Sequence, residues 1–116
     1  MAQGIMGRLA AVDLVGATDT VVYTVPENHI AQVQINIVNR GPDHVHLRLA
    51  LCAEDTPELS EYLEYDTQLL TGGSLEKTGV VLDATKRIVV RIDKEDVADA
   101  EIAVNVHVLG VEVSTI

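Results

Sequence analysis

Two neighbouring stretches decide the fold: residues 30–38 read Ile-Ala-Gln-Val-Gln-Ile-Asn-Ile-Val, and residues 44–52 read His-Val-His-Leu-Arg-Leu-Ala-Leu-Cys. In both stretches apolar side chains alternate with other residues, and a period of two gathers the apolar set on one face only in an extended strand. Between them lies Asn-Arg-Gly-Pro-Asp at 39–43. Gly41 tolerates a positive φ there, and Pro42 ends strand pairing. The pattern therefore predicts a β-hairpin.

Further strands are expected on both sides of this pair. The expected strands are residues 20–25, 62–66, 75–82, 86–92, 100–109 and 111–115. Short strands at intervals of about 8–12 residues, separated by turn residues, are typical of a sandwich. The chain has no Phe or Trp, so its core must consist of small branched residues, which suit β-sheets. The sequence predicts an all-β, antiparallel two-sheet β-sandwich of about seven to eight strands, Ig-like or jelly-roll-like.

Three segments depart from the strand pattern. Residues 56–61 are expected to form one helical turn, with Thr56 as N-cap and Pro57 as the first helical residue. Residues 94–99 are a second candidate for a helical turn or an acidic loop. Residues 1–9 have no strand partner nearby in sequence, so we expect a short N-terminal arm followed by a single domain over 10–116.

Length and charge exclude several classes of protein. The 116 residues are 47% hydrophobic and carry 8 Lys and Arg against 18 Asp and Glu, a net charge of −10. This length suits one domain, and the apolar content excludes a disordered chain. The acidity disfavours nucleic acid, whose binding depends on clustered basic residues. No signal-peptide pattern and no membrane-length apolar run is present, so we expect no membrane association and synthesis in the cytoplasm.

Two candidate reactive sites are weak. His44 and His46 share one strand face, a spacing that allows metal binding together with His107 or a carboxylate, but ordinary polar-face residues are the simpler interpretation. Cys52 is the sole cysteine, so it forms no internal disulfide. Its parity is outward, and the neighbouring Glu54 and Asp55 would raise the pKa of a thiol and disfavour a nucleophile. We expect neither a metal site nor a catalytic cysteine.

The segment from Glu54 to Asp66 is acidic, with six carboxylates and no Lys or Arg. Calcium-loop spacing is absent, so a solvated rim, or a patch that meets a basic partner, is the favoured interpretation. Within it only Leu59, Leu63 and one Tyr are expected to point inward. Because the chain also lacks a nucleophile elbow and a phosphate-binding glycine loop, we predict no enzyme activity, no cofactor, and no catalytic or metal-binding residues.

Four segments carry a resemblance to a known family. They are Tyr-Thr-Val-Pro at 23–26, Asn-Ile-Val-Asn-Arg-Gly at 36–41, Glu-Tyr-Leu-Glu-Tyr-Asp at 61–66 and Leu-Glu-Lys-Thr-Gly-Val-Val-Leu at 75–82. As an ordered set, together with Gly-Ile-Met-Gly-Arg at 4–8, they resemble a small domain of tailed-bacteriophage virion proteins. The match spans about residues 4–92. The part beyond Asp93 departs from that family, because it is longer and more acidic than a short closing strand.

The resemblance implies a non-enzymatic structural protein of the virion, assembled in the host cytoplasm. Within that class a capsid decoration or cement protein, bound to the major capsid protein or other virion proteins and forming a dimer or trimer, is favoured. The alternative is a tail, neck, baseplate or fibre-associated component. A carbohydrate- or cell-surface-binding module is the alternative from another class, but such sites favour aromatic platforms and the chain has only three Tyr and no Trp.

The expected contact residues are Ile5, Met6, Arg8 and Leu9 in the N-terminal arm. Three of them are apolar and lack a local partner, so we expect the arm to become ordered against a neighbouring subunit, next to one sheet edge. Arg8 would pair with an acidic neighbour, for instance the segment 54–66 of another copy. Deletion of residues 1–7 is accordingly expected to leave folding intact and to abolish incorporation into particles.

Overall fold

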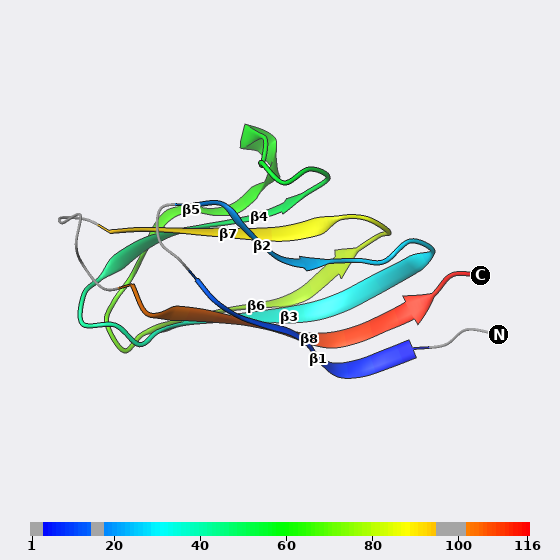
Figure 1. Ribbon diagram of the computed structural model, residues 1–116, viewed down its shortest axis with the longest axis horizontal. Coiled ribbons are helices and arrows are strands. Elements are labelled where there is room, and N and C mark those ends of the chain that lie inside the picture. Colours follow the sequence, from blue (N-terminus) through cyan, green and yellow to red (C-terminus); the bar gives the residue numbers. More distant parts are fainter. Residues whose placement is uncertain (1–3, 15–17, 95–101) are drawn as a thin grey trace.

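The computed structural model describes residues 4–14, 18–94 and 102–116. These residues form eight strands and one short 3-10 helix: β1 (Gly4–Asp13), β2 (Thr20–Thr24), β3 (His29–Asn39), β4 (Val45–Cys52), η1 (Leu59–Glu61), β5 (Tyr62–Leu69), β6 (Ser74–Leu82), β7 (Arg87–Lys94) and β8 (Val104–Ser114). They build two four-stranded sheets that stack face to face (Figure 1). The all-β sandwich that the alternation predicts is confirmed.

All strand pairs are antiparallel. Sheet I has the order β1-β8-β3-β6, and sheet II has the order β2-β7-β4-β5. The core lies between them and is built from alternate strand positions; its fully buried large side chains are Ile35, Ile37, Leu47, Leu49, Ile88, Ile92 and a set of valines. Tyr23 is the one aromatic residue in this core, in line with a composition that lacks Phe and Trp.

The predicted hairpin between residues 30–38 and 44–52 is wrong. These stretches form β3 and β4, which belong to different sheets, so residues 40–44 carry the chain from one sheet to the other. Alternation determines which face of a strand is buried but not which strand lies beside it. Both apolar faces point into the same core from opposite sides, which satisfies the pattern equally well.

The expectation that residues 4–9 become ordered only against a neighbouring subunit is also wrong, although they have no strand partner nearby in sequence. These residues form the first part of β1, which pairs with β8 from Gly4 opposite Val113 to Asp13 opposite Asn105. The partner strand lies at the other end of the chain, so a search for local pairing could not find it. Residues 1–3 of the expected arm lie outside the described residues.

Two smaller expectations need revision. In place of two strands at 100–109 and 111–115 the structure has one continuous strand, β8, which begins at Val104 and contains Gly110; residues 100 and 101 lie outside the described residues. The helical turn expected at 56–61 exists only as η1, capped by Glu58 and not by Thr56. Most of the second candidate turn, 94–99, lies outside the described residues.

Candidate interaction surface

Three polar links hold the sandwich together, and residues of the segments 23–26, 36–41, 61–66 and 75–82 take part in them. The first joins the two sheets through the core. The hydroxyl of Tyr23 on β2 donates a hydrogen bond to Oε2 of Glu112 on β8 at 2.5 Å, and both side chains are buried. Burial and the adjacent Glu112 carboxylate raise the pKa of Tyr23 well above its usual range.

The second link is Asn39, which is fully buried at the crossing from sheet I to sheet II. Its Nδ2 donates to the carbonyl oxygens of Asp43 at 2.8 Å and Leu69 at 3.1 Å. Its Oδ1 accepts the backbone N–H of Gly41 at 3.0 Å. Every side-chain polar group of Asn39 is thus occupied in fixing the loop that leaves β3 against the end of β5.

The third link is an ion pair between Lys77 on β6 and Glu64 on β5, strands at the edges of different sheets. Glu64 also accepts a hydrogen bond from the hydroxyl of Thr67 at 2.7 Å. The hydrogen bond from Lys77, followed by that from Thr67, lowers the pKa of Glu64. This ion pair joins the β6 edge of sheet I to the β5 edge of sheet II.

The acidic segment forms an exposed rim, as predicted, at Glu54, Asp55, Glu58 and Asp66. The prediction that Leu59 and Leu63 point inward is wrong, because their exposed fractions are 85% and 43%. The short η1 turn lies outside sheet II and its Leu59 has no core to face. The rim therefore includes apolar as well as acidic side chains.

Arg48 on β4 is held at this rim by two partners. Its guanidinium lies 4.1 Å from the centre of the Tyr65 ring, and its Nε donates to Oδ1 of Asp66 at 2.6 Å. The hydrogen bond from Arg48 lowers the pKa of the Asp66 carboxyl. One face of the most exposed tyrosine of the described residues is thereby covered by a cation.

Cys52 has outward parity, as predicted, yet it is 1% exposed. Its Sγ–H donates to the carbonyl oxygen of Glu54 at 3.1 Å, so the loop after β4 folds back over it. Burial, and then the charge of Glu61, raise the pKa of the thiol. A buried thiol with a raised pKa is a poor nucleophile.

The two strand histidines have separate neighbours. The backbone N–H of Thr71 donates to Nδ1 of His44 at 3.1 Å, and Nδ1 of His46 lies 3.4 Å from the carbonyl oxygen of Asp66. Among the described residues no group of three or more His, Cys, Asp or Glu is arranged to hold a metal ion. Metal independence remains a prediction.

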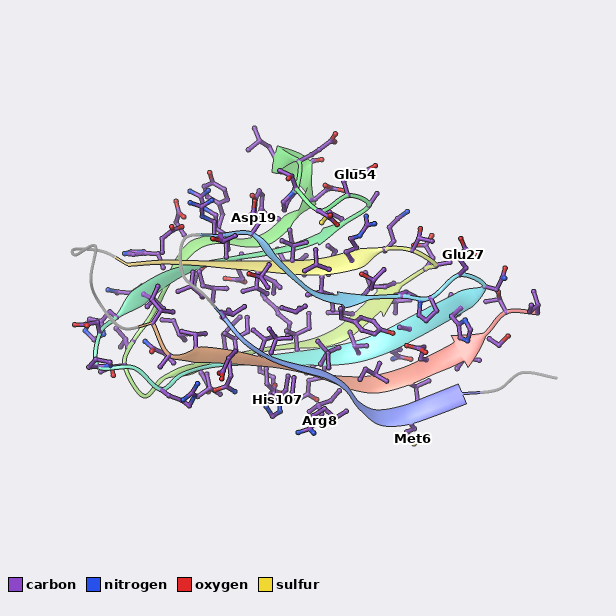
Figure 2. All side chains as sticks on the ribbon, in the orientation of Figure 1. Met6, Arg8, Asp19, Glu27, Glu54 and His107 are labelled. Atoms are coloured by element: carbon purple, nitrogen blue, oxygen red, sulfur yellow. The ribbon has the colours of Figure 1, made fainter. Side chains whose placement is uncertain are left out.

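The four expected contact residues do not share one face. Met6 and Arg8 lie on the outer face of sheet I, together with His107 of β8, as Figure 2 shows. Leu9 is the extra residue of a β-bulge between Arg8 and Ala10, and it packs against the core. Ile5 lies in β1 opposite Glu112, but its side chain is outside the description.

The outer face of sheet I carries more apolar side chains than the sequence pattern indicates. In register across the sheet, Met6 lies opposite Val111, Val111 opposite Gln32, and Gln32 opposite Val81. We use the name outer apolar patch for the outward residues at this end of the sheet: Met6, Ile30, Val81, Leu109, Val111 and Val113. Met6 is 82% exposed, Val81 64% and Ile30 44%.

A signal for this patch was present in the sequence. From 104 to 113 apolar residues occupy both parities of β8, because the inward set of Val104, Val106 and Val108 is followed by an outward set of Leu109, Val111 and Val113. Strands that are buried on both faces show such runs. A division of this segment at Gly110 into two expected strands hides the outward apolar set.

A shallow hollow of about 360 Å³ lies on the same face and includes Val111, the cross-strand partner of Met6, in its lining. Its lining includes Leu109, Gly110, Val111, Gln32 and Gly79. Gly110 is required there, because a Cβ would lie 2.1 Å from the carbonyl oxygen of Gln32. The outer face therefore presents a protruding methionine and a shallow depression.

Each edge strand of the two sheets carries a bulge. The extra residue is Leu9 in β1 and Val22 in β2, and the register also slips on β6 between Val80 and Lys77 and twice on β5. Bulges on edge strands interrupt the ladder that a further strand would need. The bulges therefore disfavour the pairing of a further strand along these edges, and the predicted contact through the arm and a sheet edge stays a prediction.

The chain matches no protein-family model, and no curated protein matches it in sequence. Among solved structures it is similar to a chain in the structure of the infectious bursal disease virus Gx strain, with a TM-score of 0.49 and 8% sequence identity. The similarity covers 97% of this chain and 36% of that one, so the chain spans about a third of its neighbour. A likeness of this degree carries no information about function.

No helix in the described part of the chain is long and apolar enough to cross a membrane.

Proposed function

We propose that this protein is a non-enzymatic structural component of a tailed-bacteriophage particle, and specifically a decoration or cement protein of the head. One observation carries the proposal. In the four segments that resemble virion proteins, polar side chains make hydrogen bonds and ion pairs that join strands of the sandwich; these residues are Tyr23, Asn39, Arg40, Glu64 and Lys77.

Each of these segments has an identified mechanical role. Tyr23 links the two sheets through Glu112, and Asn39 fixes the crossing loop. Glu64 and Lys77 join β5 to β6. Arg40 donates to Asp13 at 2.6 Å and to Asn105 at 2.7 Å, which clamps β1 and β8 at the end of β3.

These hydrogen bonds and ion pairs between strands make the sandwich a rigid body. Its main surfaces are the outer faces of the two sheets. A rigid module loses little conformational freedom when it attaches to a lattice, and this favours binding by a small domain. A role that requires a stiff unit with exposed faces therefore accounts for the residues that the resemblance picks out. The partners would be the major capsid protein or another virion protein.

The carbohydrate-binding alternative has a specific difficulty. Tyr62 and Tyr65 form an edge-to-face pair with ring centres 5.0 Å apart on the outer side of sheet II. Arg48 lies over the Tyr65 ring, so the aromatic face that a sugar would stack on is partly taken. A glycan array with the purified chain tests this alternative, and specific binding to a glycan would favour it.

The proposal is tested by binding of the purified, fluorescently labelled chain to phage heads that lack it and, separately, to isolated tails. We expect saturable co-sedimentation with heads and none with tails. Binding to tails alone would replace the head assignment with the tail, neck or baseplate alternative. Binding to neither would contradict the proposed function.

A further inference from the structure

We propose that two copies of this chain associate through the outer faces of sheet I, with Met6 of each copy packed against Val81 of the other. The inference concerns the molecule in solution and goes beyond the proposed function. It is derived from four features of the described residues: exposed apolar area, charge distribution, bulged edges and the geometry of the register.

The first feature is the outer apolar patch itself. Met6 and Val81 are both more than half exposed and lie on the same cross-strand row, at opposite edges of sheet I. The residues between them on this row are Val111 and Gln32. Exposed apolar side chains gathered on one face, and rimmed by polar residues, mark interaction sites on soluble proteins.

The second feature is charge, which decides between a second copy and an unrelated partner. The chain has a net charge of −10, so two copies repel each other unless the contact avoids the carboxylates. In the described strands of sheet I only two outward side chains are carboxylates, those of Asp13 and Glu76. Asp13 is paired with Arg40. The outer face of sheet I, on which Arg8 is also exposed, is thus where two copies can meet with little repulsion.

The third feature is the bulge on every edge strand, described above. Association by adding strands edge to edge is disfavoured, because each edge has an interrupted ladder. Face-to-face packing of sheets needs no free backbone groups and is the arrangement that already forms the core of this sandwich. It also places apolar side chains against each other.

The fourth feature is that the face complements itself. A two-fold axis along the strands, between β8 and β3, lays β1 of one copy over β6 of the other. Because Met6 and Val81 share a row, each Met6 then meets the partner copy's Val81. Two reciprocal contacts of this kind, Met6 on Val81 and Val81 on Met6, are what a two-fold symmetric pair requires.

The available area is sufficient for a modest dimer. The longest strands of sheet I have 11 residues, and four strands of that length cover about 36 Å by 19 Å, roughly 700 Å² per copy. A typical stable interface buries about 800 Å² per partner. The face is therefore no larger than a typical interface, and we expect a reversible dimer whose population depends on the protein concentration.

Sedimentation of the full chain over a range of concentrations tests the association. We expect the mass to rise with concentration from 12.5 kDa towards twice that value. Added salt should strengthen the dimer by screening the like charges. A mass of 12.5 kDa at every concentration would overturn the proposal.

Two charge insertions locate the surface. Val81→Glu places a carboxylate in the patch, and Leu59→Glu places one at a site outside sheet I that is also more than half exposed. We expect Val81→Glu to weaken dimerisation at least tenfold with an unchanged melting temperature, and Leu59→Glu to dimerise as the unaltered chain does. Equal effects of the two substitutions, or none, would contradict the assignment of the surface.

A disulfide tests the pairing directly. Within one copy Met6 and Val81 are three strand spacings apart, about 14 Å, which is too far for a disulfide. A chain with Met6→Cys and Val81→Cys should therefore form a covalent dimer on oxidation, whereas Met6→Cys with Leu59→Cys should not. Failure of the first pair to cross-link would overturn the two-fold arrangement. Because head binding is measured separately, failure here leaves the proposed function standing.

Discussion

At the scale of single residues, the hydrogen bond between Tyr23 and Glu112 can be tested most directly. Both groups are buried, so Tyr23→Phe leaves the Glu112 carboxylate without its hydroxyl donor. We expect a loss of about 1–3 kcal/mol of unfolding free energy, measured by urea denaturation. Tyr65→Phe is the matched control, since Tyr65 is 51% exposed, and it should change stability by less than about 0.5 kcal/mol. Similar losses in both variants would contradict the assigned role.

The same hydroxyl predicts a pH dependence. The pKa of Tyr23 is raised in the folded chain, so the protonated hydroxyl stabilises the fold. This contribution is complete below the ordinary tyrosine pKa of about 10 and is lost as the pH rises above it. Unfolding of the unaltered chain should become easier above pH 10, and the part of that slope due to Tyr23 should vanish in Tyr23→Phe. If the unfolding free energy depended on pH above 10 in the same way in the two proteins, this role of Tyr23 would be contradicted.

At the scale of elements, β8 depends on a close backbone approach. Gly110→Ala would place a Cβ 2.1 Å from the carbonyl oxygen of Gln32 on β3, whereas Gly79→Ala meets nothing within 4 Å and carries only the strain of its φ of 69°. We expect Gly110→Ala to destabilise the chain far more than Gly79→Ala, which should cost about 1–2 kcal/mol. Thermal unfolding measures the difference. A smaller effect at Gly110 would contradict the description of β8.

The pairing of β1 with β8 changes what a terminal deletion should do. Removal of residues 1–7 takes away the half of β1 that pairs with β8 from Val113 to Gly110. We now expect a lower melting temperature, at about 4–8 °C for each kcal/mol lost. Removal of residues 1–3 alone, which precede β1, is the control and should leave the melting temperature nearly unchanged. Equal melting temperatures after both deletions would contradict the pairing.

The element scale also shows where sequence reasoning stops. The alternation in 30–38 and 44–52 predicts which side chains are buried, and the structure buries them. Neither the partner of β1 nor the crossing after Asn39 could be predicted, because strand neighbours are decided by contacts far apart in the chain. For the same reason the outer apolar patch could not be predicted as a whole. The outward apolar residues of β8 are visible in the sequence, but their neighbours Met6, Ile30 and Val81 come from three other strands.

At the scale of the whole molecule, low pH should weaken the ion pairs that β5 makes with β6 and with β4. The pKa values of Glu64 and Asp66 are lowered by Lys77 and Arg48. The stabilisation is therefore present above the ordinary carboxyl pKa values of about 4 and is lost as the pH falls below them. The melting temperature should drop below pH 4, and less steeply in Glu64→Gln. Glu54→Gln, at an exposed position outside these ion pairs, is the control. A slope unchanged by Glu64→Gln would show that this pair contributes nothing.

The central claim is that this rigid sandwich is a repeated component of a phage head. The most direct measurement is the absolute amount of the chain, relative to the major capsid protein, in purified particles by quantitative mass spectrometry with labelled peptide standards. A decoration protein should be present at a fixed, simple ratio to the capsid protein and should stay with the heads when tails are removed. Absence from the particles, or an amount typical of a neck or baseplate component that leaves with the tails, would contradict the claim.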